Sequence, residues 1–475
     1  MRPETLDFMR SLANAPSPSG FEQPAAEVYR RYTERYADLV RTDVAGNVAA
    51  VLNPEAEARI MLAGHIDEIG FLVHHIREDG LLHFSGIGGH DDVTPVGQRV
   101  WVHGRQRLPG VVGSRAFHLL SPDEKTKRPE IKKLWIDIGA RSRAEAEEVV
   151  RLGDPVTFQQ EFQPLMGERA AARGFDNTAG AVIIAEAMRL LHDEGGLHPE
   201  MGLYAVATVQ EEIGSRGAQT ATEAIGPVTG LVVDMDHATD LPRLDETQLG
   251  QLELGRGPTI ARGANVNPVV FDLLTSAARE EGIPYQVSVF AGITPTDANA
   301  VQVGRAGVAT GLVGVALRYM HTPSETLSLA DVEACARLVA AYCRRVGRTR
   351  TSRRASRTAR ETGGEAWRTG PFTSRQGREG QYLRAPSRPS PLCARRGRPS
   401  NAAWAGTFLF RMLPDGVPGP GGFAGCMSNC ECPRGLRVLS PRYGNDAFSA
   451  PDAVPQPRGT PGGRERLPNR PERGR

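Results

Sequence analysis

Short apolar runs typical of strands alternate with segments of helical apolar spacing between residues 166 and 346. Such alternation favours an α/β fold in which helices cover both faces of a mixed sheet. The N-terminal 68 residues add two helix-like and two strand-like segments to the same pattern. Strands are expected at residues 47–53, 59–63, 202–208, 231–233, 285–290 and 308–315. Helices are expected at residues 5–14, 22–38, 179–191, 271–281 and 329–346.

The stretch from residue 69 to residue 165 has a different character. It is rich in Val, Ile, Gly and Thr, and its short strand-like runs are separated by closely spaced turn residues. This pattern predicts a small β-barrel or sandwich. We therefore expect one α/β domain, made of residues 1–68 and 166–348, that is interrupted by an inserted β domain of residues 69–165.

Charge and composition separate residues 349–475 from the rest of the chain. Residues 1–348 hold 34 Lys+Arg and 46 Asp+Glu, whereas residues 349–475 hold 23 and 9. Arg, Pro, Gly and Ser dominate this last part without a sustained apolar period, so we expect a disordered basic tail. A frameshift product is an alternative, because a shifted frame in GC-rich DNA tends to give these residues. Without aromatic interleaving or a folded frame, specific nucleic-acid binding is not expected.

Cysteine usage and hydropathy bear on the cellular compartment. Cys335 and Cys343 share one apolar helical pattern and are expected to be buried, with no sign of a disulfide framework. The four cysteines of the tail match no common zinc-finger spacing. No run of 18 apolar residues and no secretory signal is apparent, so no membrane partner is expected and the cytoplasm is the expected location.

Five segments place polar or charged residues directly after strand-like runs. Ligands of open α/β sheets bind beyond the carboxyl ends of the strands, so these segments are expected to gather at one edge. The segments are His65-Ile66-Asp67, Asp176-Asn177, Glu211-Glu212, Asp234 and His321.

The residue types in these segments suit a pair of divalent cations. Such a pair needs neutral imidazoles and carboxylates, one of which can bridge. Asp67 follows His65 by two residues, so on a strand it shares a face with the imidazole and could brace it. Two adjacent glutamates cannot both face one point from a regular strand, so one would bind metal and the other act as base. The candidate ligands are His65, Asp176, Glu212, Asp234 and His321.

Each signal taken alone also has an ordinary structural explanation. Asp176-Asn177 could cap a helix, and Glu211-Glu212 could lie on a solvated helix face. Asp234 and His321 could be loop or turn residues. The order and setting of the segments therefore have to support the interpretation as a site. Histidines within the β insertion are expected to be structural or surface residues, namely His74, His75, His83, His103 and His118.

Longer motifs surround these residues and occur in a characteristic order. They are Ala-Pro-Ser-Pro-Ser-Gly-Phe-Glu (15–22), Ala-Gly-His-Ile-Asp-Glu-Ile-Gly-Phe (63–71), Gly-Phe-Asp-Asn-Thr-Ala-Gly (174–180), Val-Gln-Glu-Glu-Ile-Gly-Ser-Arg-Gly-Ala (209–218), Asp-Met-Asp-His-Ala-Thr-Asp (234–240) and Arg-Tyr-Met-His-Thr-Pro-Ser-Glu (318–325). Across residues 5–346 the chain resembles the tetrahedral aminopeptidase family, the glutamyl-aminopeptidase-like co-catalytic metallopeptidases.

The resemblance implies a di-zinc exopeptidase-like fold and a metal-dependent aminopeptidase that hydrolyses N-terminal residues from peptides. One zinc or cobalt ion would be held by His65, Asp234 and a bridging Asp176. The second ion would be held by Glu212, His321 and the same Asp176. Glu211 would be the general base toward a water activated by both metals, and Asp67 would support His65. The β insertion would take part in self-association, in a family whose members commonly form dodecamers.

Two segments depart from the family pattern. Gly292-Ile293-Thr294-Pro295-Thr296-Asp297 replaces a Gly-Gly-Thr-Asp run, which leaves the preferred N-terminal residue open, and His90 stands where an aromatic residue is expected after Gly88-Gly89. A related di-metal deacylase or dipeptidase would need a similar ligand set. A glycosidase would use paired carboxylates without a di-metal centre. A non-catalytic assembly protein on this scaffold would lack Glu211 or a ligand, and none is missing.

Overall fold

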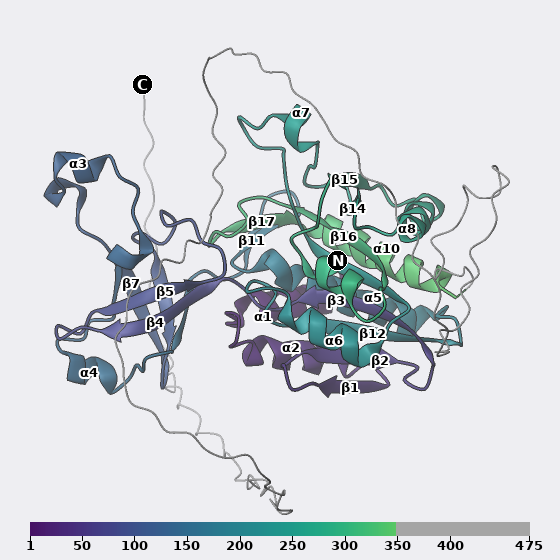
Figure 1. The fold of residues 1–475 in the computed structure, drawn as a ribbon, viewed down its shortest axis with the longest axis horizontal. Coiled ribbons are helices and arrows are strands. Elements are labelled where there is room, and N and C mark those ends of the chain that lie inside the picture. The colour runs from purple at the N-terminus through teal and green to yellow at the C-terminus, as the bar shows by residue number, and fades with distance from the viewer. Residues whose placement is uncertain (348–475) are drawn as a thin grey trace, which may run out of the picture. The chain divides into compact units, whose positions relative to one another are not determined.

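An eight-stranded mixed sheet forms the centre of the fold in the computed structural model, which describes residues 1–347 (Figure 1). Its four central strands, β12, β3, β13 and β16, run parallel, and β1, β2 and the β14–β15 pair complete its two sides. In spatial order the strands are β1 (Leu39–Thr42), β2 (Val48–Leu52), β12 (Met201–Thr208), β3 (Ala58–His65), β13 (Thr229–His237), β16 (Ala309–Leu317), β14 (Thr259–Gly263) and β15 (Gln286–Phe290).

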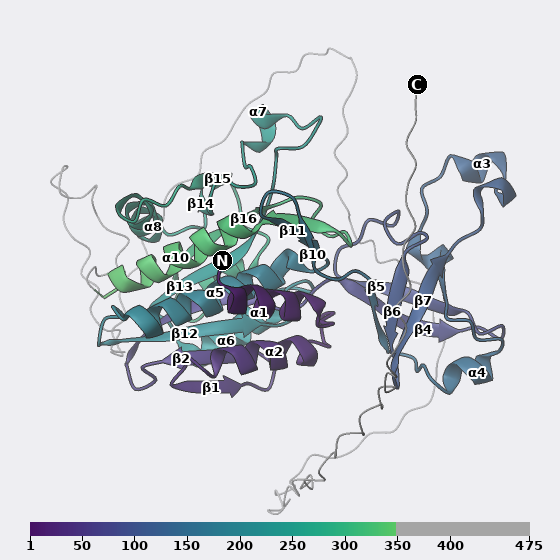
Figure 2. The ribbon, with the colours of Figure 1, turned by 180° about the vertical axis from the view of Figure 1, so that it is seen from behind.

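Helices cover both faces of this sheet, as the sequence predicts. Successive strand residues point to opposite faces, so Ile60 and Leu62 of β3 join one apolar core while Met61 and Ala63 join the other. Figures 1 and 2 show the two faces. The larger core is covered by α1 (Pro3–Asn14), α2 (Gln23–Thr33), α5 (Phe175–Glu194), α8 (Pro268–Glu280) and α10 (Leu329–Arg345). The smaller core is covered by α6 (Arg216–Ile225) and α9 (Asp297–Val303).

Local capping explains where some elements depart from the prediction. Helix α8 begins at Pro268 rather than at residue 271, because Oδ1 of Asn267 accepts hydrogen bonds from the N–H groups of Val269 and Val270. The helix predicted over 22–38 is α2, which ends at Thr33. The chain then forms β1, which pairs with β2 and was not predicted.

A closed six-stranded barrel confirms the predicted small β-barrel. Its core contains Phe71, Phe84, Val100, Ile136 and Phe158. In closing order its strands are β4 (Gly70–Ile76), β5 (Leu82–Ile87), β8 (Trp135–Asp137), β7 (Arg107–Gly113), β6 (Arg99–His103) and β9 (Pro155–Phe158). The domain limits at 69 and 165 stay a prediction.

A three-stranded sheet that the sequence did not predict joins distant segments of the chain. Its strands are β10 (Gln163–Leu165), β11 (Arg169–Ala172) and β17 (Glu325–Ser328). The remaining short helices are α3 (Pro122–Lys125), α4 (Arg143–Glu147) and α7 (Glu246–Leu249).

Cys335 and Cys343 are buried in α10, as predicted. No helix within residues 1–347 is long and apolar enough to cross a membrane. The disordered basic tail predicted for 349–475 lies outside the described residues, as do its cysteines.

Candidate metal centre

The parallel strands of the central sheet bring the predicted site residues to one edge. His65 is the last residue of β3, and its register partner Thr208 ends β12, after which the chain continues to Glu211 and Glu212. His321 follows the end of β16. Asp234 was expected directly after a strand but lies inside β13, which continues to His237. The carboxyl ends of these parallel strands therefore gather the side chains, as the sheet geometry requires.

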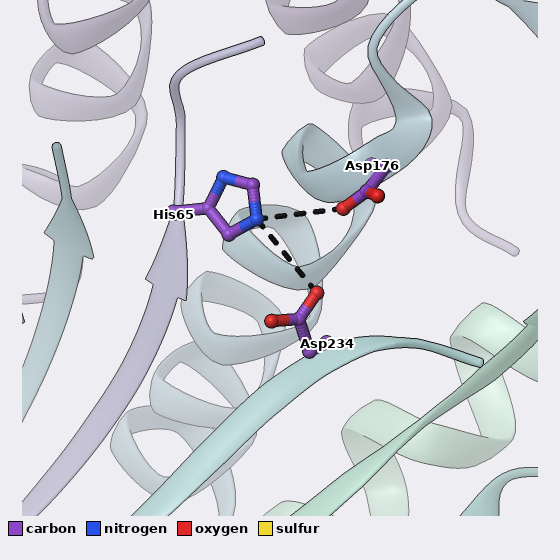
Figure 3. Close-up of side chains that lie close together, drawn as sticks. All are labelled: His65, Asp176 and Asp234. Carbon is purple, nitrogen blue, oxygen red and sulfur yellow. Dashed lines mark ion pairs between the residues drawn. The ribbon is translucent and has the colours of Figure 1, made fainter. Parts of the chain in front are cut away.

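Asp176 lies between two histidines that belong to separate clusters of ligand atoms. Its Oδ1 is 3.4 Å from Nε2 of His65, which is also 3.7 Å from Oδ1 of Asp234 (Figure 3). Its Oδ2 is 3.5 Å from Nε2 of His321, which is also 3.3 Å from Oε1 of Glu212. Within each cluster the ligand atoms lie within 4.8 Å of one another. The two carboxylate oxygens of Asp176 thus face two different groups of three residues, which we call triads. One triad is His65, Asp176 and Asp234, and the other is Asp176, Glu212 and His321.

The local backbone at Asp176 departs from the helix in which it lies. Asp176 and Asn177 have non-helical dihedral angles within the first turn of α5. The side chain of Asn177 is tied down, because its Nδ2 donates to the carbonyl oxygen of Val233 and its Oδ1 accepts from the N–H of Gly180. The alternative that Asp176 is a simple helix cap does not account for its contacts with two imidazoles.

Glu211 and Glu212 lie in a loop rather than on a strand, and both side chains line the same cavity. We expected adjacent glutamates to face different points. The loop changes this, because Gln210 and Ser215 adopt left-handed backbone conformations on either side of the pair. Glu212 contacts His321, whereas Oε2 of Glu211 is 3.9 Å from Nε2 of His65 and belongs to neither triad.

Asp67 is fully buried behind this loop and joins it to His65. Its Oδ1 and Oδ2 accept the backbone N–H groups of Glu211 and Glu212 at 3.0 and 3.1 Å. The hydroxyl of Ser19 donates to Oδ2 at 2.7 Å. Nδ1 of His65 is 3.4 Å from Oδ1 of Asp67 and 3.1 Å from its carbonyl oxygen. Asp67 lies beyond the end of β3, so the contact arises from the turn rather than from a shared strand face.

Glu325 makes a second clamp of the same kind, and the sequence interpretation gave it no role. Its Oε2 accepts the N–H of Asp176 at 2.9 Å, and its Oε1 accepts the N–H of His321 at 2.8 Å. The side chain is 2% exposed, and burial raises its pKa well above the ordinary value. The available signal was its position four residues after His321, in the last of the motifs quoted above.

The electrostatics of the cavity reflect several carboxylates sharing a buried space. Burial raises the pKa of Glu211 to about 9 and that of Asp234 to about 7. Hydrogen bonds with Asp176 and Glu212 raise the pKa of His321 to about 11. Burial alone would raise the pKa of Asp176, but the imidazoles of His321 and His65 hold it well below its usual range. The cavity therefore favours positive charge.

The donor set fits a pair of divalent cations. Each triad presents one imidazole nitrogen and carboxylate oxygens, which are ligands of zinc and related metals. Asp176 is common to both triads, as a bridging carboxylate must be. Nδ1 of His65 faces the Asp67 carbonyl oxygen, which leaves Nε2 directed at the cluster.

The cavity around the triads has a volume of about 240 Å³. Six of the seven predicted residues line it, and Asp67 lies behind them. Met235, Phe290, Leu312 and Met320 add apolar surface. The arrangement combines a cation site with room for a small organic group.

The connection after β5 contributes glycines beside the centre. A side chain at Gly88 would press on Ile69 and on Glu212, and one at Gly89 would contact the ring of His321. His90 stacks on Phe71 with ring centroids 4.4 Å apart, and its Nε2 lies 2.7 Å from the carbonyl oxygen of Gly70. The histidine thus fills the place in which an aromatic residue was expected.

The 292–297 segment also reaches the cavity. Pro295 and Thr296 line it, while Asp297 is fully buried and accepts a 2.6 Å hydrogen bond from the hydroxyl of Thr208. Burial raises the pKa of Asp297 to about 6. The histidines that we expected to be structural or surface residues belong to neither triad; they are His74, His75, His83, His103 and His118.

Comparisons with known proteins agree with these observations. The model of the M42 glutamyl aminopeptidase family matches residues 46–338. The lysyl aminopeptidase of Pyrococcus furiosus is 34% identical over 341 residues, which cover 70% of this chain and 95% of the relative.

Solved structures are similar over the same part of the chain. The TET aminopeptidase of Thaumarchaeota archaeon SCGC AB-539-E09 has a TM-score of 0.69 and 35% identity, covering 72% of this chain and 96% of that one. The TET1 peptidase of Pyrococcus horikoshii, which can assemble into a tetrahedron or a large octahedral shell, has a TM-score of 0.64 and 31% identity, with coverage of 71% and 99%.

Proposed function

The chain belongs to the M42 glutamyl aminopeptidase family, and on that basis we propose that it hydrolyses N-terminal residues from peptides with two divalent metal ions, zinc or cobalt. The observation that carries the proposal is the position of Asp176. Its two oxygens face the imidazoles of separate triads, which is the geometry of a carboxylate that bridges two cations. His65 and Asp234 would complete one ion's ligands, and Glu212 and His321 the other's.

A pair of cations bound there would lower the pKa of a shared water and polarise the scissile carbonyl. Glu211 is the carboxylate that lies beside both triads without belonging to either. The bound cations would lower the pKa of Glu211 and favour its ionised form. In the proposal its carboxylate accepts the proton of the attacking water and delivers a proton to the departing amine. Asp67 acts as a positioning residue, since it holds the backbone of Glu211 and the ring of His65.

The proposed centre also favours a free N-terminus. One of the two bound ions would hold the free α-amine as a ligand, and an acylated nitrogen could not take its place. This supports exopeptidase action over deacylation.

The two domains of the chain would have different functions. We assign catalysis to residues 1–68 and 166–348, and self-association to the β domain of residues 69–165. The relevant observation is that the similar TET1 peptidase assembles into closed shells. The cytoplasm remains our expected location.

The Glu211→Gln variant tests the assignment of the base. We expect the full-length variant to keep its metal content and to lose about 100-fold or more in kcat on aminoacyl p-nitroanilides. Glu161→Gln, at an exposed position away from the cavity, is the matched control. Full activity of Glu211→Gln with normal metal content would show that another group is the base.

A comparison of free and N-acetylated peptides separates aminopeptidase from deacylase activity. The wild-type chain should release the first residue of free peptides and leave their N-acetyl counterparts intact. Faster hydrolysis of the N-acetyl peptides would favour the deacylase instead.

A further inference from the structure

A larger groove opens from the metal-site cavity. Its volume is about 610 Å³, and it shares Asp236, His237 and Phe290 with the smaller cavity. No residue that lines the groove belongs to either triad. A molecule that extends out of the metal site through these shared residues enters this groove, which we call the β15 groove.

One wall of the β15 groove is an edge strand. In the described sheet β15 is the last strand and pairs with β14 alone. Its final residue, Phe290, lines both cavities, while Val287 and Val289 line only the groove. The strand therefore leads from the groove toward the metal site. An edge strand offers unpaired N–H and C=O groups, to which an extended peptide can add.

The groove exposes apolar side chains that a folded domain normally covers. Val289 is 77% exposed and Val287 is 42% exposed on β15. Leu249 and Leu244 of the facing 238–252 segment are 57% and 40% exposed, and Tyr319 is 50% exposed. A concave apolar surface of this kind marks a binding site. Its continuity with the metal site identifies the occupant as the substrate rather than a separate partner.

We propose that the β15 groove binds the departing part of the peptide, with apolar side chains at the second and third substrate residues. The inference rests on the proposed function, because it requires the N-terminal residue to occupy the metal site. With that residue beside Phe290, the substrate runs outward past Val289 and Val287 and is therefore antiparallel to β15. The preferred substrates are peptides whose N-terminal residue is followed by apolar residues.

The test compares peptides that differ only at the second residue. The full-length, metal-loaded chain is assayed with Leu-Leu-Ala-Ala and Leu-Asp-Ala-Ala, and the quantity of interest is the ratio of their kcat/KM values. We expect a ratio well above one in the wild type and a fall of about tenfold in Val289→Asp, since buried apolar contact is exchanged for a charge. Val44→Asp, at a fully exposed turn position, is the matched control and should keep the wild-type ratio.

A second measurement probes the strand pairing. An extended chain beside β15 would pair through alternate amides. N-methylation at one of two successive amides beyond the scissile bond should therefore lower kcat/KM far more than methylation at the other. Equal effects would overturn the antiparallel arrangement.

The outcomes distinguish this inference from the proposed function. Leucinamide has no residue beyond the scissile bond and does not reach the groove, so failure of the wild type to hydrolyse it would overturn the proposed function and the inference with it. Hydrolysis of that compound with no preference at the second residue, or with an unchanged ratio in Val289→Asp, overturns the inference alone. A smaller assembly of Val289→Asp in light scattering, with an unchanged ratio, would make the groove a contact between copies and also overturn it.

Discussion

Two buried carboxylates, Asp67 and Glu325, organise the candidate centre without belonging to either triad. The two oxygens of Asp67 accept the backbone N–H groups of Glu211 and Glu212. The two oxygens of Glu325 accept those of Asp176 and His321. These bonds satisfy buried backbone donors, and a buried donor left without a partner costs about 1–3 kcal/mol. They hold in place the backbone segments that carry the candidate ligands.

Glu325→Gln should weaken metal binding without removing a candidate ligand. A glutamine offers one acceptor oxygen, so one of the two N–H groups loses its partner and Asp176 or His321 shifts. We expect metal affinity to fall about 10–100-fold, the effect typical of residues that orient ligands. Titration with zinc and a competing chelator measures it, with the exposed Glu333→Gln as control. Wild-type affinity in Glu325→Gln would refute the clamp.

The raised pKa of Glu22 should make the folding stability depend on pH. Burial and the charge of Asp67 raise its pKa from 4.5 to about 7, while its Oε1 accepts the N–H groups of Gly20 and Gln210. The folded state therefore prefers the protonated acid, and folding stability falls as pH rises from 4.5 through 7. The loss is at most about 3 kcal/mol above that window.

Glu22→Gln removes this titration and keeps an acceptor. Relative to wild type, its free energy of unfolding should be higher at about pH 8 than at about pH 5. Urea unfolding at both values measures the difference, and the exposed Glu27→Gln is the control. A pH-independent difference between Glu22→Gln and wild type would contradict the prediction.

At the scale of elements, the sequence predicted most of the central sheet and its ligand-bearing strand ends. Apolar runs such as residues 202–208 identify buried strands whatever their partners. The three-stranded sheet was missed because β11 and β17 are short and pair only through the tertiary fold. The clamp by Glu325 was missed for the same reason, since a lone Glu at the start of a short strand carries no signal of its distant partner Asp176. The left-handed turns around Glu211 and Glu212 also leave no clear mark in the sequence.

Gly314→Ala tests how closely β13 and β16 must approach. Gly314 is the register partner of Asp234, and a Cβ there would collide with the Asp234 carbonyl oxygen. We expect a loss of about 1–3 kcal/mol in stability, as for other overpacked sites, together with weaker metal binding as Asp234 moves. Gly292→Ala, where a Cβ meets nothing within 4 Å, is the control. Wild-type stability and metal affinity in Gly314→Ala would contradict this account.

At the scale of the whole molecule, the family membership predicted from ordered motifs is confirmed. The barrel was predicted from composition and turn spacing, and it is present. Its assembly role remains a proposal. The connection between β7 and β8 exposes Phe117 and Leu119, at 62% and 72%, which is apolar surface that a partner copy could cover.

The double variant Phe117→Glu with Leu119→Glu should lower the molar mass of the assembly. Both side chains are exposed in the single chain, so its folding stability should change by no more than about 0.5 kcal/mol per site. Light scattering after size-exclusion chromatography measures the mass, with Val44→Glu as control. An unchanged mass would exclude this surface from assembly.

We propose that two cations, bridged by Asp176, enable peptide hydrolysis. The most direct test strips the full-length chain with a chelator and returns zinc or cobalt stepwise while metal content and leucine p-nitroanilide hydrolysis are followed together. We predict no hydrolysis without metal and full activity at two ions per chain. Full hydrolysis by the metal-free chain would contradict the claim.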